Sequence, residues 1–195
     1  MKKKKENTIP VLLQKITSPE KIIKVFPTGT EIKLIAKADN PKLKKDLLGT
    51  VVRVTPEGLI EIIWETGEFD TLNICEDAFD KIYPISAIYV EKGKPAQTIK
   101  VGNDYLTIRK ILNCDNICSS YIFQDPVILL KDDDADYKGL PVNRTIYKEN
   151  TLIDMVSGPF LLVRISANAD FISIPATLEA KYRNLFSKID KIVIE

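Results

Sequence analysis

The chain has 195 residues, of which 45% are hydrophobic and 28% charged, with 28 basic and 27 acidic side chains and no histidine. This length accommodates one large domain or two small ones, and the apolar fraction is high enough for a buried core. The missing imidazole excludes catalytic Ser–His and Cys–His pairs and histidine-ligated metals, so we predict no catalytic residue, no metal, no cofactor and no enzymatic activity.

The first 26 residues form a basic lead-in with seven lysines against two glutamates. Its apolar stretch, residues 9–13, is far shorter than the roughly 20 residues that cross a membrane, and no signal-peptide cleavage site follows it. We therefore expect a cytoplasmic protein that does not engage a membrane. Within the lead-in, Ser18-Pro19-Glu20 is typical of a helix start and predicts a short helix that ends before Pro27.

Residues 27–85 alternate between apolar and polar side chains, a pattern typical of half-buried strands. Strands are expected at residues 30–36, 50–54, 59–64 and 71–74, and a closing strand within residues 77–85. Five short strands with a long first loop predict a small SH3-like β-barrel. Trp64, at the end of a strand, and Tyr83 are candidates for an aromatic groove that binds a peptide.

Charge is unevenly distributed along this predicted barrel. Residues 56–80 contain eight acidic side chains and neither lysine nor arginine. Such a segment repels the phosphates of nucleic acids and suits a protein partner of opposite charge. The long first loop carries Lys42, Lys44 and Lys45, which are candidate contacts to DNA or RNA.

Residues 86–195 mix strand and helix patterns and predict an α+β domain with a mixed or antiparallel sheet and two helices. Helices are expected at residues 104–112, with Asp104 as N-cap, and at residues 175–187. Strands are expected at residues 87–90, 97–101, 121–123, 127–130, 158–165 and 192–194. The continuous apolar run Phe160-Leu161-Leu162-Val163 indicates a strand that is buried on both faces.

One motif of this second domain, Gly139-Leu140-Pro141-Val142-Asn143-Arg144, combines a permissive glycine and a rigid proline with an amide and a guanidinium. Asn143 and Arg144 are candidates for holding an anionic group. The alternative is a structural role, in which they tie a loop to the sheet and Arg144 pairs with Asp154. The acidic run at residues 132–136 lacks the glycine and glutamate of a calcium-binding loop, so we interpret it as a solvated hairpin tip.

Both halves of the chain resemble families found in phages, plasmids and conjugative elements. Residues 29–82, through Gly49-Thr50-Val51-Val52 and the strand that ends in Trp64, resemble a small domain of unknown function with an SH3-like build. Residues 88–186 are similar to a second uncharacterised family. The matching stretches are Asp125-Pro126-Val127, residues 139–144, residues 153–160, and a last helix that carries Tyr182 and Phe186.

These features together predict a non-enzymatic binding protein of a phage or mobile element. The partner that we expect is a host protein, such as a defence factor, recognised in part by the acidic segment. One alternative is a sponge for a nucleotide-type ligand, held by Asn143 and Arg144. A second alternative is a DNA- or RNA-binding accessory protein that uses the basic lead-in with Lys42, Lys44 and Lys45.

Overall fold

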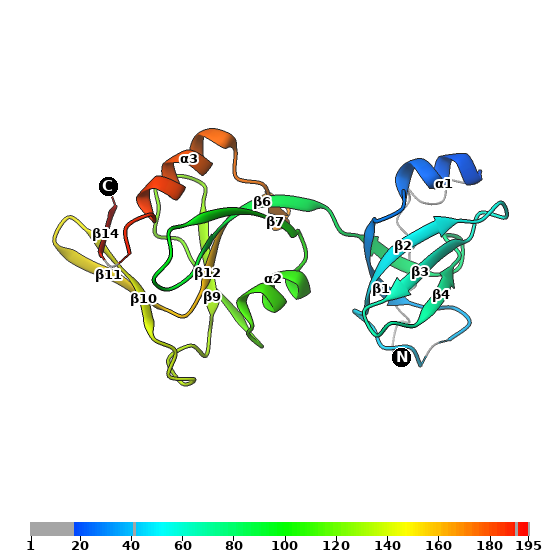
Figure 1. Cartoon of the computed structure of the whole chain (residues 1–195), viewed down its shortest axis with the longest axis horizontal. Helices are drawn as coiled ribbons and strands as arrows, with labels where there is room; N and C mark the ends of the chain where they lie inside the picture. The colour runs from blue at the N-terminus through cyan, green and yellow to red at the C-terminus, as the bar shows by residue number, and fades with distance from the viewer. Residues whose placement is uncertain (1–17, 41, 190, 195) are drawn as a thin grey trace, which may run out of the picture. The chain divides into compact units, whose positions relative to one another are not determined.

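The structure is a computed structural model that describes residues 18–40, 42–189 and 191–194. The chain divides into two compact units, residues 1–83 and residues 84–195 (Figure 1). Most of the basic lead-in, residues 1–17, lies outside the described residues, and so does the apolar stretch at residues 9–13. No described helix is long and apolar enough to cross a membrane.

The first unit contains a short helix and one antiparallel sheet. The helix predicted after Ser18 is confirmed as α1, which spans Pro19–Val25. The strands follow as β1 (Glu31–Ala36), β2 (Leu48–Val54), β3 (Ile60–Trp64), β4 (Phe69–Leu72) and β5 (Ala78–Lys81). Their order in the sheet is β4-β3-β2-β1-β5. The sequence therefore located all five strands correctly, apart from shifts at their ends.

The predicted SH3-like barrel is wrong, because this sheet does not close. β4 and β5 are its two edges, and no described pairing joins them. Alternation shows only that each strand has one buried face, and an open sheet covered by a helix satisfies the same pattern. Here Ile22, in α1, and Phe26, just after it, belong to the buried core. The centre of the Phe26 ring lies 5.5 Å from the centre of the Phe79 ring.

The second unit contains two sheets and two helices. The larger sheet runs β7-β6-β12-β9-β8, with β13 beside β12, and the smaller sheet runs β11-β10-β14. The larger sheet is built from β6 (Pro84–Val90), β7 (Gln97–Gly102), β8 (Ile117–Ser120), β9 (Ile128–Asp132), β12 (Phe160–Ile165) and β13 (Phe171–Ile172). The smaller sheet is built from β10 (Val142–Lys148), β11 (Thr151–Ser157) and β14 (Lys191–Ile194). The helices are α2 (Tyr105–Leu112) and α3 (Ala176–Leu185).

Strand β12 lies in the middle of the larger sheet and is buried on both faces, as predicted. Phe160 and Leu162 face one hydrophobic core, which also contains residues of α3 and of the smaller sheet. Leu161 and Val163 face a second core, which α2 covers with Ile108. Figure 1 shows α2 and α3 on opposite sides of this sheet. The unit is therefore layered, with the smaller sheet and α3 on the same side.

The predicted α+β class is also wrong, because β-strands dominate and the helices are short. Both predicted helices are confirmed, and the Asp104 carboxylate caps α2 by accepting hydrogen bonds from the N–H groups of Leu106 and Thr107. The strands β10 and β11 were not predicted, since register shifts in their pairing, such as that between Ile146 and Tyr147, interrupt the alternation. The strand expected at residues 121–123 is not formed, and β8 precedes that position.

Candidate functional site

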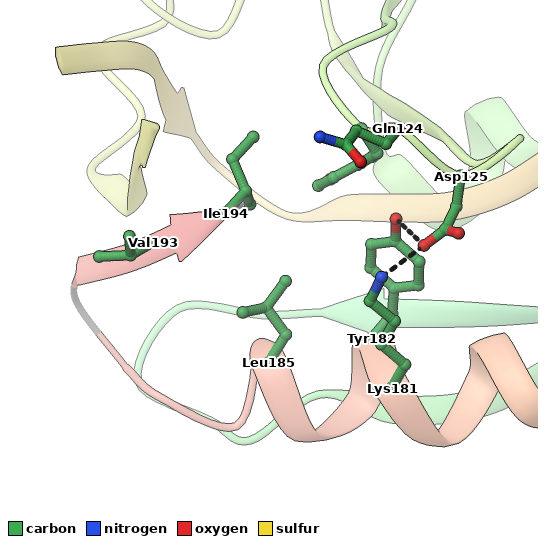
Figure 2. Close-up of a pocket in the computed structure, with 8 residues that line it drawn as sticks. Gln124, Asp125, Lys181, Tyr182, Leu185, Val193 and Ile194 are labelled. Atoms are coloured by element: carbon green, nitrogen blue, oxygen red, sulfur yellow. Dashed lines mark hydrogen bonds and ion pairs between the residues drawn. The ribbon is translucent and has the colours of Figure 1, made fainter. Parts of the chain in front are cut away.

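A cavity of about 290 Å³ lies in the second unit between α3, β14 and the segment that leads into β9 (Figure 2). We call it the α3 cavity. Its lining residues are Phe123, Gln124, Asp125, Lys181, Tyr182, Leu185, Val193 and Ile194. Because these side chains come from three separate stretches of the chain, only the folded unit brings them together.

The polar end of the α3 cavity is an ion pair with a hydroxyl. The Asp125 carboxylate accepts hydrogen bonds from Lys181 Nζ at 2.8 Å and from the Tyr182 hydroxyl at 3.0 Å (Figure 2). Lys181 holds the pKa of Asp125 below its usual range, and burial together with Asp125 raises the pKa of Tyr182. Both shifts move the pKa values further from neutral pH, whereas acid–base catalysis needs a pKa near the working pH. This end of the cavity is therefore better suited to binding than to proton transfer.

Replacing Lys181 with methionine is expected to raise the pKa of Asp125 toward its ordinary value of 3.8, because the main cause of the lowering is removed. A Tyr182→Phe variant removes the weaker hydroxyl contact and should raise this pKa less. An NMR titration of the carboxyl carbon measures both. The stabilisation that Asp125 contributes is present above its ordinary pKa and is lost as pH falls through the lower folded value. An unchanged pKa in Lys181→Met would contradict this assignment.

The family of the chain follows from the second unit. Residues 85–187, slightly more than half of the chain, match the model of a domain of unknown function, DUF3846. The chain belongs to the DUF3846 family. This agrees with the uncharacterised family expected for the second half. No curated protein and no solved structure matches the chain.

The DUF3846 match covers most of the α3 cavity. Six of the eight lining residues lie within residues 85–187, and the other two, Val193 and Ile194, follow in β14. Sequence reasoning did not single out this cavity. A signal was nevertheless present, because Asp125 and Tyr182 are both in stretches that carried the family resemblance.

The predicted site residue Arg144 lies inside the DUF3846 domain with an exposed fraction of 0%. Its Nη1 donates to the Asn143 side-chain oxygen at 2.6 Å and to the Asn143 carbonyl at 3.1 Å. Its Nη2 donates to the carbonyls of Lys94 at 2.8 Å and Phe186 at 3.3 Å. Arg144 therefore links β10 to the turn after β6 and to the end of α3.

Asn143 and Asp154, the other two candidates in this domain, also contact protein groups. Asn143 Nδ2 donates to the carbonyls of Val90 at 3.1 Å and Gly158 at 2.8 Å. Asp154 accepts hydrogen bonds from Lys131 Nζ at 2.8 and 2.9 Å. None of these three candidates is among the residues that line the α3 cavity.

The aromatic candidates lie in the first unit, outside the DUF3846 match. Trp64 is buried, and its indole N–H donates to Asp70 Oδ2 at 3.2 Å. Tyr83 is exposed, and Lys81 Nζ lies 5.2 Å from the centre of its ring. Trp64 ends β3, whereas Tyr83 follows β5, and β2 and β1 lie between these strands in the sheet order. The structure therefore does not place the two candidates on neighbouring strands.

Trp64 instead lines a second cavity, of about 570 Å³, which we call the acidic cavity. Its lining residues are Lys37, Asp39, Asn40, Leu43, Trp64, Glu68, Phe69 and Asp70. The candidate lysines Lys42, Lys44 and Lys45 are exposed in the loop that supplies Asn40 and Leu43, and they are not among the lining residues. Within residues 18–40, 42–189 and 191–194, no group of acidic or cysteine side chains is arranged to hold a metal ion.

A buried lysine organises the acidic cavity. Lys37 Nζ lies 2.8 Å from Asp39 Oδ1, 3.6 Å from Asp77 Oδ2 and 3.7 Å from Asp70 Oδ1, with only 4% of its side chain exposed. Burial alone lowers the pKa of Lys37, but the carboxylates outweigh it, so this pKa is raised overall. Sequence reasoning missed Lys37 because a bulge between Leu34 and Ala36 shifts the alternation of β1 just before it.

Proposed function

We propose that the chain is a non-enzymatic binding protein of a phage or other mobile element. In this proposal it engages a basic surface of a host protein in the cytoplasm, for example on a defence factor. The observation that carries the proposal is the acidic cavity, in which carboxylates and aromatic rings line one hollow of the first unit.

The charge of this cavity favours a basic partner. Asp39, Glu68 and Asp70 line it against a single cation, Lys37, whose charge is already matched by the carboxylates around it. No lysine or arginine occurs at residues 56–80, which supply half of the lining. Complementary charge speeds the encounter of two proteins and disfavours partners of the wrong sign.

An exposed aromatic residue favours a protein as the partner. Phe69, on the edge strand β4, lines the cavity and is 75% exposed. Aromatic side chains are enriched in protein interfaces and are frequent among the residues that dominate binding energy. An arginine or lysine of the partner can reach the carboxylates while its aliphatic part packs on this ring.

The geometry offers less support for the two alternatives. Asn143 and Arg144, which would hold a nucleotide, are buried and hydrogen-bonded to protein oxygens. Lys42, Lys44 and Lys45, which would bind a nucleic acid, share their unit with the acidic segment, whose charge repels phosphates. A basic protein surface fits the first unit better than either ligand.

The proposal is tested by affinity capture from host lysate with the full chain and three single variants, Glu68→Gln, Glu57→Gln and Phe69→Ala. The two glutamate variants each remove one exposed carboxylate from the same acidic segment, but only Glu68 lines the cavity. For a captured partner, we expect Glu68→Gln to weaken binding roughly two- to fivefold, the effect of one exposed ion pair. Phe69→Ala should weaken it about tenfold, and Glu57→Gln should leave it unchanged.

The salt dependence of capture gives a second measurement. Binding should weaken as ionic strength rises, because added salt screens exposed charges. Equal loss in Glu57→Gln and Glu68→Gln, or capture that salt does not affect, would show that the acidic cavity is not the binding surface. Failure to capture any partner would count against the whole proposal.

A further inference from the structure

The smaller sheet of the second unit ends in an open strand beside the α3 cavity. β14 runs parallel to β10 and has no other strand partner in the described part of the chain. A strand at the edge of a sheet presents N–H and C=O groups that an extended segment of another protein can pair with.

The α3 cavity is lined in part by this edge strand. Val193 and Ile194 are consecutive residues of β14, so their side chains project to opposite faces of the sheet, yet both line the cavity. Ile194 is buried, whereas Val193 is 48% exposed. Figure 2 shows Leu185, Val193 and Ile194 toward one end of the space and the group of Asp125, Lys181 and Tyr182 at the other.

The size and chemistry of the cavity indicate what it takes. Its volume of about 290 Å³ is at the lower limit of small-ligand sites, which span roughly 300–1,000 Å³, and suits one large side chain. Phe123, Leu185 and Ile194 supply apolar walls. Asp125 and Lys181 already neutralise each other in an ion pair, so this end of the cavity has little net charge to attract a charged occupant, whereas the apolar walls favour an apolar one.

We propose that the α3 cavity and β14 together form a peptide-binding site. An extended segment of a partner protein pairs with the free edge of β14 and places one large apolar side chain, aromatic or leucine, in the cavity. The strand pairing supplies affinity that is independent of sequence, and the cavity supplies the selection for the inserted side chain. The site lies in the second unit and does not depend on the acidic cavity.

Three blocked peptides of alternating threonine and valine test the proposal against the isotope-labelled full chain by NMR. The first has a central phenylalanine, the second has alanine there, and the third repeats the first with N-methyl groups on alternate backbone nitrogens. The phenylalanine peptide should cause saturable shifts in the amide signals of Leu185, Val193 and Ile194. The alanine peptide should bind about tenfold more weakly, because it leaves the cavity empty. The N-methylated peptide should lose binding to a similar extent, because it cannot complete the strand pairing.

A matched pair of variants locates the site. Val193 and Ile189 are β-branched residues with similar exposed fractions, 48% and 46%, but only Val193 lines the cavity. Val193→Lys should weaken binding of the phenylalanine peptide about tenfold, and Ile189→Lys should leave it within about twofold. Absence of saturable shifts, equal affinity of the phenylalanine and alanine peptides, or full binding of the N-methylated peptide would each overturn the proposal.

Discussion

Replacing Lys37 with methionine is expected to lower the free energy of unfolding of the first unit by about 3–5 kcal/mol at neutral pH. The reason is that the carboxylate of Asp77, which is as buried as Lys37, would lose the ammonium that lies 3.6 Å from it. Asp77 cannot move away easily, because its carboxylate accepts hydrogen bonds from the backbone N–H groups of Ala38 and Asn73. Urea unfolding followed by the fluorescence of Trp64, the single tryptophan of the chain, measures the loss.

The pH dependence of this loss has a definite sign. The pKa of Lys37 is raised, so its contribution is complete below the ordinary lysine value of 10.5 and disappears as pH rises through the higher folded value. The pKa of Asp39 is lowered mainly by Lys37, so its contribution is present above 3.8 and disappears as pH falls through the lower folded value. The difference between the wild type and Lys37→Met should therefore be largest around neutrality and shrink toward both extremes.

Lys33→Met is the matched control for Lys37→Met. Lys33 is also a lysine of the β1 region, but the carboxylate oxygen with which it pairs, on Asp80, is 4.0 Å away and that side chain is 53% exposed. Such a pair is worth less than about 1 kcal/mol, so this variant should unfold close to the wild type. Equal stability of the Lys37 and Lys33 variants would contradict the role given to Lys37.

Replacing Arg144 with alanine is expected to lower the free energy of unfolding of the second unit by about 3–5 kcal/mol. The change leaves the carbonyls of Lys94 and Phe186 without their donor and empties the volume of a fully buried side chain. Arg183→Ala, which removes an exposed arginine of α3, should change stability by less than about 0.5 kcal/mol. Urea unfolding followed by circular dichroism measures both variants.

This experiment also separates a structural role of Arg144 from a ligand-binding role. Calorimetry with a panel of nucleotides on the wild type and on Arg144→Ala supplies the second measurement. A variant that keeps its stability but loses a nucleotide-binding heat seen in the wild type would favour the nucleotide sponge and contradict the structural role. We expect Arg144→Ala to lose stability. We expect the wild type to give no binding heat with any of the nucleotides.

The local pattern of the sequence predicted the positions of many strands and of all three helices, but not the fold class. The alternation of residues 30–36, the capping aspartate of α2 and the apolar run of β12 each report an environment that neighbouring residues create, so they can be recognised without a structure. Closure of a barrel depends on whether two distant edges pair, which alternation does not encode. The β10–β11 hairpin was missed for a local reason, because its register shifts interrupt the period of two.

The candidate sites were harder to predict than the strands, because they depend on contacts between distant parts of the chain. Asp125 and Lys181 are 56 positions apart, and their ion pair forms only when α3 packs beside the segment before β9. Lys37 meets Asp70 and Asp77 in the same way. Composition indicated an acidic first unit, but only the fold shows which of its carboxylates share a cavity.

β14 has a consequence for how this family is delimited. Sequence similarity to the family ends at residue 187, whereas the strand that completes the smaller sheet lies at Lys191–Ile194. Ile192 and Ile194 belong to the same buried core as Tyr182 and Phe186. In this chain the folded domain is thus longer than the stretch that the family model matches, and a boundary drawn at residue 187 would remove a strand that contributes to its core.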